Sequence, residues 1–117
     1  MFNGCTSLTS VDLSAATFAA VVNNDTMFYN CTSLTTFAAP AAAVAFPTTA
    51  TNTALSFSNS PLTYQSIVNI ANWLADLTGA NAKTVTFNAT AWNALTAAEQ
   101  ATIQGILSGK NWTLATA

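Results

Sequence analysis

The feature that most constrains how this 117-residue chain can fold is an internal repeat at its start. Residues 1–10 read MFNGCTSLTS and residues 27–36 read MFYNCTSLTT, so the same residue types return in the same order after 26 positions. A third, decayed copy, SFSNSPLT, follows at residues 56–63 and is one residue shorter. Repeats of about 20–29 residues with leucine at a fixed phase have the length of one solenoid coil, which buries its apolar side only against its neighbours. The repeat therefore predicts stacked coils.

The last third of the chain changes from this repeat to helical patterns. Residues 64–77 place apolar side chains three and four positions apart, with Thr63 as the N-cap and Gly79 as the C-terminal stop. A second helix is expected over residues 97–108, because the preceding Thr96-Ala97-Ala98-Glu99 is a capping box. Two helices therefore close the C-terminal end of the predicted stack.

The predicted fold class is α/β, a solenoid of short parallel strands that ends in a helical cap. The strands are expected at residues 10–13, 35–38, 83–87 and 112–115. One repeat domain, residues 1–117, is divided into two short coils and two longer helix-bearing coils, at residues 1–26, 27–52, 53–82 and 83–117. The longer coils follow from a second periodicity of about 30 residues, which aligns residues 62–79 with residues 92–109.

The Met-Phe-x-x-Cys-Thr-Ser-Leu-Thr phrase resembles the coils of the BspA-type leucine-rich-repeat family of bacterial surface and phage virion proteins. The tail, from NSPLTYQSIVNIANWLADLTG to GKNWTLAT, is similar to the terminal module of that family. The resemblance implies a right-handed stack with a parallel sheet on one face, used outside the cell for adhesion, receptor contact or scaffolding. It carries over no catalytic residues. The leucine phase is lost over residues 38–54, where the chain departs from the family pattern.

Charge is scarce in this chain and excludes some partners. Only 5% of residues are charged, the net charge is -2, and Lys83 and Lys110 are the only cations. Two lysines cannot neutralise a run of phosphates, so nucleic acid and anionic membranes are not expected partners. The longest apolar run, residues 37–46, is shorter than the roughly 20 residues of a transmembrane helix, so no membrane insertion is expected. A net charge near zero gives little repulsion between copies and favours assembly.

The residue inventory argues against an enzyme. The chain has no histidine and no arginine, so neither a Ser-His-Asp nor a Cys-His set can be assembled. The carboxylates of Asp12, Asp76 and Glu99 are expected on a strand surface, at a helix end and in a cap, which does not suit paired-carboxylate chemistry. Neither a metal site nor a cofactor is expected.

Cys5 and Cys31 occupy equivalent positions in the first two coils. Neighbouring strands lie about 4.8 Å apart, so the two sulfur atoms could be adjacent. One interpretation is a disulfide and the other is a ladder of buried thiols, each filling a small apolar space in its own coil.

Two further sequence features suggest surface contacts. Asn-x-Ser/Thr sequons, which accept glycans only in hosts that make them, occur at Asn24, Asn30, Asn88 and Asn111. Trp73 and Trp92 are expected in the core, whereas Trp112, on the last strand, is a candidate for stacking on a sugar.

The N-terminal end of the predicted stack has no cap. Phe2, Leu8, Val11 and a strand edge would be exposed there, and they form the candidate interaction surface. Further repeats, another copy of the chain, or a different virion or surface protein would cover it. We therefore expect a non-catalytic structural module of a phage virion or extracellular filament that self-associates through uncharged faces. The alternative is an adhesin module that binds a glycan or host receptor through its sheet face or Trp112.

Overall fold

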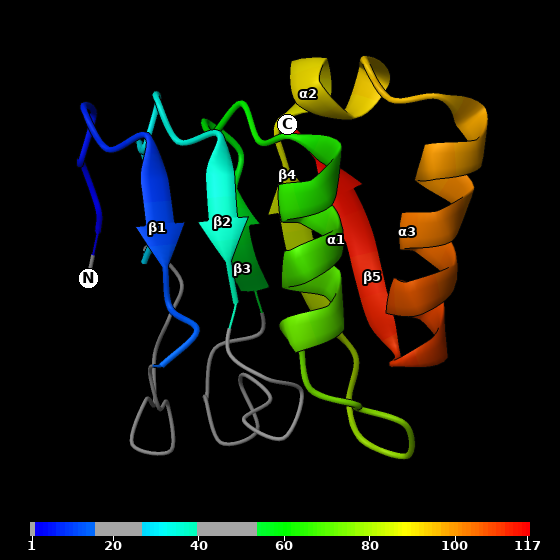
Figure 1. Cartoon of the computed structure of the whole chain (residues 1–117). Helices are drawn as coiled ribbons and strands as arrows, with labels where there is room; N and C mark the ends of the chain where they lie inside the picture. Colours follow the sequence, from blue (N-terminus) through cyan, green and yellow to red (C-terminus); the bar gives the residue numbers. More distant parts are fainter. Residues whose placement is uncertain (1, 16–26, 40–53) are drawn as a thin grey trace.

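The computed structural model describes residues 2–15, 27–39 and 54–117 (Figure 1). The strands are β1 (Ser10–Asp12), β2 (Thr36–Ala38), β3 (Ala54–Phe57), β4 (Lys83–Phe87) and β5 (Trp112–Thr116). The helices are α1 (Tyr64–Trp73), α2 (Ala89–Asn93) and α3 (Ala97–Gly109). Each strand pair within these ranges is parallel. The predicted combination of short parallel strands and helices is therefore confirmed.

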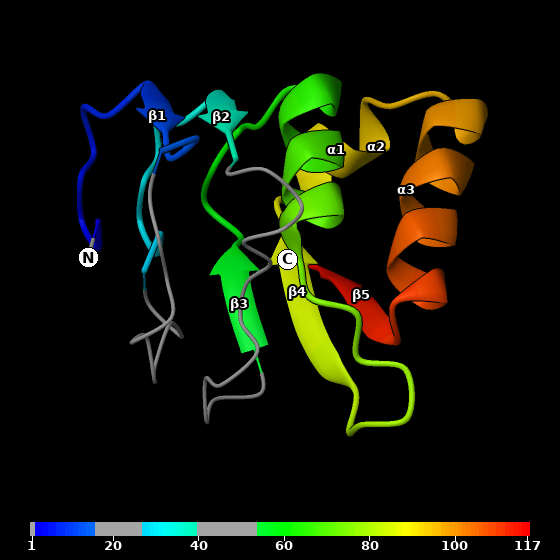
Figure 2. The same ribbon diagram turned by 60° about the horizontal axis from the view of Figure 1, so that its bottom comes forward.

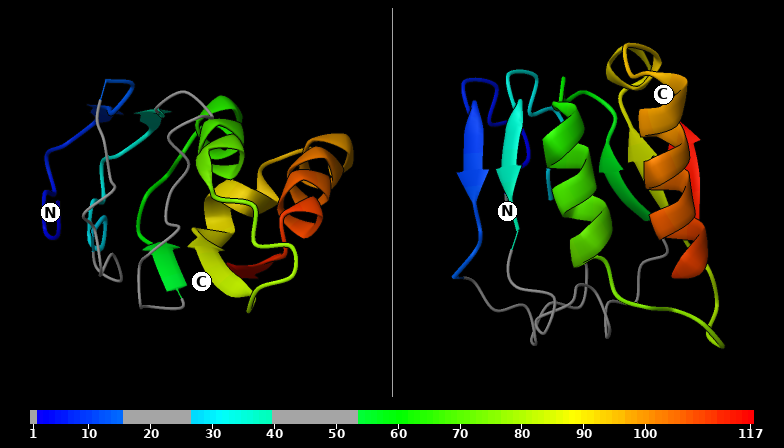
Figure 3. Two further views of the ribbon diagram at one scale, coloured as in Figure 1. Left: turned by 90° about the horizontal axis from the view of Figure 1, so that it is seen from below. Right: turned by 45° about the vertical axis from the view of Figure 1, so that its right-hand side comes forward.

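The elements form two layers (Figures 1 and 2). The front layer places β1, β2, α1 and α3 side by side, and the back layer is the sheet β3-β4-β5. The view from below separates the two layers most clearly (Figure 3). The single sheet on one face implied by the family resemblance is therefore wrong for this part of the chain. Helix α1 packs beside β2 where a third strand would continue that sheet, because residues 64–73 carry the helical apolar spacing.

The third copy of the repeat, inferred from the sequence, is confirmed by its contacts with the second. The Asn59 Nδ2 atom donates to Asn30 Oδ1 at 2.8 Å, and the Thr63 amide donates to the Thr35 carbonyl at 3.0 Å. The offset falls from 29 to 28 residues between these two contacts, as the one-residue deletion requires. The second periodicity of about 30 residues also recurs in the back sheet, where Phe57 pairs with Phe87.

A ladder of phenylalanine rings runs through the interior between the layers. The rings of Phe2, Phe28, Phe57 and Phe87 stack in that order, with centroids 5.4, 4.9 and 6.1 Å apart and planes within 18° of parallel. Phe37 packs edge-on against two of them. All of these rings except Phe2 are fully buried. Phe2 and Phe28 belong to the Met-Phe phrase, Phe57 to the third copy, and Phe87 is the partner of Phe57 in the back sheet, so the recurring phenylalanine position builds the centre of the core.

Both predicted helix starts are confirmed, but the end of the first helix is not. The Thr63 side chain accepts the Ser66 amide, and Thr96 and Glu99 form the capping box. Helix α1 ends at Trp73 and not at residue 77. Its last carbonyls are held by the Lys110 ammonium group, so the chain leaves the helix before it reaches Gly79, which lies in a turn at φ +80°.

Other boundaries differ in smaller ways. Strand β3 and the short helix α2 were not predicted as such, whereas the helix expected at residues 97–108 is confirmed as α3. The extents proposed for the coils at residues 1–26 and 27–52 include segments outside the described residues. Within those residues, no helix is long and apolar enough to span a membrane.

Candidate functional site

The outer edge of β1 lies at the N-terminal end of the front layer, and it is open in the sense that no strand or helix among the described residues pairs with it. The Thr36 amide donates to the Thr9 carbonyl at 3.2 Å, and the Leu13 amide donates to the Ala38 carbonyl at 2.9 Å. Backbone groups of a strand alternate in direction, so those of Thr9, Val11 and Leu13 face β2. The N–H and C=O groups of the intervening Ser10 and Asp12 therefore point away from β2, toward the end of the molecule.

The matching edge of β2 is closed by side chains of α1. The Ser66 hydroxyl accepts the Phe37 amide at 3.0 Å and lies 3.0 Å from the Thr35 carbonyl, to which it donates. The Asn69 Nδ2 atom donates to the Phe37 carbonyl at 2.8 Å. Two polar side chains thus satisfy the backbone groups that a third strand would otherwise bind. Neither residue was predicted to have this role, although a serine and an asparagine on the side of a helix that packs against the sheet are a detectable signal.

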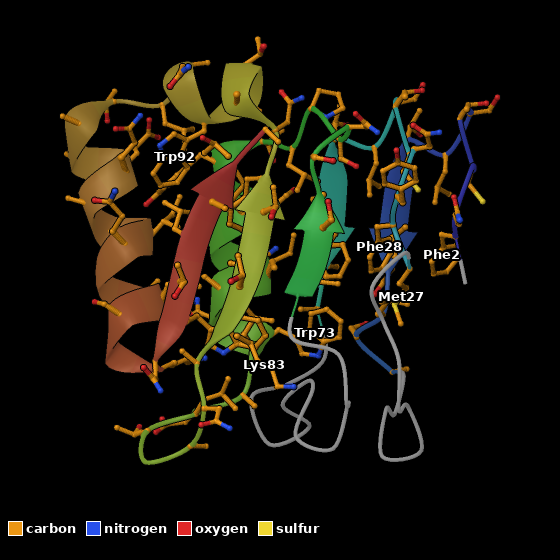
Figure 4. The ribbon with its side chains drawn as sticks, turned by 180° about the vertical axis from the view of Figure 1, so that it is seen from behind. Phe2, Met27, Phe28, Trp73, Lys83 and Trp92 are labelled. Atoms are coloured by element: carbon orange, nitrogen blue, oxygen red, sulfur yellow. The ribbon has the colours of Figure 1, made fainter. Side chains whose placement is uncertain are left out.

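The structure places the three predicted surface residues differently. Phe2 is half-buried, with one ring face against Phe28 (Figure 4), and Leu8 is also half-buried. The expectation that Val11 is exposed is wrong, because its side chain is only 5% exposed and packs into the core. Strand alternation turns Val11 inward and its neighbours Ser10 and Asp12 outward. The open surface is therefore mainly backbone edge and the Phe2 ring.

The first copy of the repeat (the first unit) has hydroxyl groups at the same positions as the hydroxyl groups by which the second copy (the second unit) binds the first. In the second unit, Ser33 Oγ donates to the Thr6 carbonyl at 2.6 Å and Thr35 Oγ1 donates to the Thr9 carbonyl at 3.3 Å. The equivalent hydroxyls in the first unit, on Ser7 and Thr9, are exposed at the open end. The N-terminal end therefore exposes the same kind of hydroxyl groups that, in the second unit, bind the carbonyl groups of the first unit.

The two cysteines are free thiols in the structure. Cys31 is fully buried and its Sγ donates to the Phe2 carbonyl at 3.0 Å, while Cys5 is half-buried. Burial raises the pKa of the Cys31 thiol. Of the two interpretations, the structure has the thiol arrangement, and Cys31 ties the second unit to the first.

The open end is almost uncharged. Asp12 is the only charged side chain in residues 2–15 and 27–39. Hydrogen bonds from Ser14 hold the pKa of its carboxyl below the usual value, so the exposed carboxylate is ionised at neutral pH.

Trp112 does not present its ring to solvent. It is 5% exposed, and its indole Nε1 donates to the Ala75 carbonyl at 2.8 Å. The preceding Asn111 and Lys110 also donate to carbonyls of the segment after α1. The expectation of a sugar-stacking Trp112 is therefore wrong, because this tryptophan helps to fasten the last strand to residues 71–80. Trp73 and Trp92 are buried, as expected.

Two of the sequons have structural roles. The Nδ2 atom of Asn111 donates to the carbonyls of Leu77 and Ala80, and Nδ2 of Asn88 donates to the Ser58 carbonyl. A glycan would replace one hydrogen of that nitrogen, so it would break one of the two hydrogen bonds of Asn111, whereas the single bond of Asn88 uses only one of its two hydrogens. The exposed Asn30 accepts from Asn59, and Asn24 lies outside the described residues.

Within the part of the chain that the structure describes, no cluster of histidine, cysteine or carboxylate side chains could hold a metal ion. No protein-family model matches the chain, and neither the curated proteins nor the solved structures searched contain a significant match to it.

Proposed function

We propose that this chain is a non-catalytic structural module, the end of a leucine-rich-repeat type of solenoid, that self-associates in a phage virion or extracellular filament. The observation that carries the proposal is the open edge of β1 next to the half-buried Phe2 ring. An unpaired strand edge is a template for association with another chain unless the protein blocks it.

The blocking devices at this edge are few. Proteins protect edges with very short strands, charged side chains, proline, bulges or a covering element. Strand β1 has two of these devices, its length of three residues and the Asp12 carboxylate, and the described elements cover only its other edge. The near absence of charge around it removes the long-range repulsion that keeps copies apart. Association through this end would be driven by backbone hydrogen bonds and by burial of apolar surface.

The stacked rings support a role in repetitive assembly. The ladder runs from Phe87 to Phe2 and ends at this half-buried ring. A core of this kind gains stability when another unit is added, because each unit packs chiefly on its neighbours. The adhesin alternative loses Trp112 as a contact residue, and no other observation favours it.

The proposal is tested with the purified chain by multi-angle light scattering over a wide concentration range, with electron microscopy of the same samples. We expect concentration-dependent dimers or longer assemblies that persist at high salt, because charge contributes little to the contact. A strictly monomeric chain at all concentrations contradicts the proposal. Monomers that bind a glycan or receptor array would support the adhesin alternative.

A further inference from the structure

The open edge of β1 is complementary to itself. We propose that two copies of this chain pair through their β1 strands, antiparallel and about a two-fold axis at Val11. This inference rests on the proposed function and specifies one contact of the self-association. Because a two-fold pair is closed, growth beyond a dimer requires a second, different contact.

The backbone groups at the edge are arranged for this pairing. With the axis at Val11, Ser10 of one copy lies opposite Asp12 of the second copy. The outward N–H and C=O groups belong to these two residues, so each opposed pair exchanges both of its hydrogen bonds. The pattern is the same from either copy, which is the requirement of an isologous interface.

The antiparallel arrangement keeps the two core faces on the same side. A two-fold axis perpendicular to the sheet reverses the strand direction and leaves Val11 of both copies pointing to one side. Parallel pairing of the same two edges would turn one copy over, so that the two Val11 side chains would point to opposite sides. Parallel pairing with both core faces on one side would need the other edge of β1, which is already bound to β2.

The side chains agree with this geometry. The two Val11 residues face each other in a pair without hydrogen bonds, with Cα atoms about 4.5 Å apart, and both point into the core layer. Each Asp12 carboxylate lies opposite a Ser10 hydroxyl and not opposite the other carboxylate, which avoids the destabilising like-charge pair. The half-buried Phe2 and Leu8 lie at the same end and would lose further contact with water.

The opposite end of the front layer is a poorer partner for this edge. There the layer ends in α3, whose exposed face is centred on Ala101 and Gly105. The exposed polar side chains of this helix, on Thr102, Gln104 and Ser108, can form single hydrogen bonds, but a helix offers no row of free backbone groups along a strand. The outer edge of β5 in the back sheet is the competing strand edge, and the cross-linking test below distinguishes it from β1.

The first test compares Asp12→Pro with Asp12→Ala in the full chain. Proline removes the outward Asp12 amide and adds bulk at the edge, while the bonds to β2 remain. We expect Asp12→Pro to raise the dimer Kd at least about tenfold, because two symmetry-related hydrogen bonds are lost. Asp12→Ala keeps the amide and should dimerise at least as well as the wild type. Circular dichroism and thermal melts establish that both variants fold.

The second test reads the register. Val11→Cys should form a disulfide between the two introduced cysteines under mild oxidation, identified by mass spectrometry of the linked peptide. Dimers that survive Asp12→Pro, or that link only through Cys5, overturn the inference but leave self-association intact. The absence of any association in the wild type overturns both proposals. If the chain instead binds only to a parallel coil of the same type, through Ser7 and Thr9, the antiparallel pairing of two β1 strands is also overturned.

Discussion

Strands β1 and β2 come from two copies of one repeat, yet their outer edges have different surroundings. The edge of β2 meets α1, whose Ser66 and Asn69 side chains bind the Phe37 backbone. The outer edge of β1 has no covering element among the described residues. The ring of Phe2, at the same end of the molecule, is only half-buried. The comparison shows that the repeat itself does not close the outer edge of its own strand. Closure is supplied by residues outside the repeat, on a helix that replaces the next strand.

The largest expected effect is the loss of stability when a ring in the middle of the phenylalanine ladder is removed, compared with the loss when the ring at its N-terminal end is removed. Phe57→Ala removes a fully buried ring that stacks between Phe28 and Phe87, and should cost about 3–5 kcal/mol of unfolding free energy. Phe2→Ala removes a half-buried ring at the open end and should cost about 1–2 kcal/mol. Urea denaturation of the two variants at low protein concentration measures the difference. Equal losses would mean that the end of the ladder is as well packed as its middle.

The second prediction removes the closure of the β2 edge. Ser66→Ala leaves the buried Phe37 amide and the Thr35 carbonyl without their side-chain partner, and should cost about 1–3 kcal/mol. Hydrogen exchange of the Phe37 amide should accelerate by at least about tenfold. Ser10→Ala, at an exposed position of β1, is the matched control and should leave both quantities nearly unchanged. Unaltered exchange at Phe37 in Ser66→Ala would show that the helix does not protect the edge.

The third prediction concerns the fastening of α1. The Lys110 ammonium group donates to the carbonyls of Ala71, Asn72 and Leu74, at distances between 2.7 and 3.1 Å. Lys110→Met keeps much of the side-chain length but loses these bonds, and should lower stability by about 1–2 kcal/mol. Lys110→Arg should recover part of the loss. If Lys110→Met has the same free energy of unfolding as the wild type, water must bind the three carbonyl groups as well as the ammonium group does.

The smallest effect is a dependence on acid. Hydrogen bonds from the Thr78 side chain and backbone lower the pKa of the Asp76 carboxyl from its ordinary value of 3.8. A carboxyl whose pKa is lower in the folded state than in the unfolded state stabilises the fold. This contribution is complete at pH values above the unfolded-state pKa, and it disappears as the pH falls through the folded-state pKa. Asp76→Ala should therefore lower Tm at neutral pH and converge with the wild type as the pH falls below the folded-state pKa of Asp76.

Asp12, whose pKa is lowered in the same direction by Ser14, provides the matched variant at the open end. Asp12→Ala should show the same convergence in acid if the two turns are equivalent. A difference between the wild type and either variant that persists unchanged at low pH would contradict an electrostatic origin.

The parts of the fold that sequence patterns predicted are those with local causes. The caps at Thr63 and Thr96 depend on residues within one helical turn, and both are present. The third repeat copy was recognisable because Phe57 and Asn59 keep the spacing that their contacts require.

The parts that could not be predicted depend on distant residues. Helix α1 ends where Lys110 binds its carbonyls, up to 39 residues along the chain. The burial of Trp112 depends on Ala75, which accepts its indole N–H from 37 residues away. No local pattern encodes either distance. At the candidate site, Phe2 and Leu8 were predicted to be exposed and are half-buried, whereas Val11 was predicted at the surface and is turned inward by strand alternation.

The sequence by itself determined the repeat, its period and the type of most elements, because periodicity and capping act over a few residues. The tertiary structure decided which edges are closed. It divided the strands between two layers, set α1 against β2, and left the backbone of Ser10 and Asp12 outward. The physical reason is that a strand edge is satisfied by whatever lies beside it in space, and for β2 that neighbour is Ser66, 29 residues beyond Phe37.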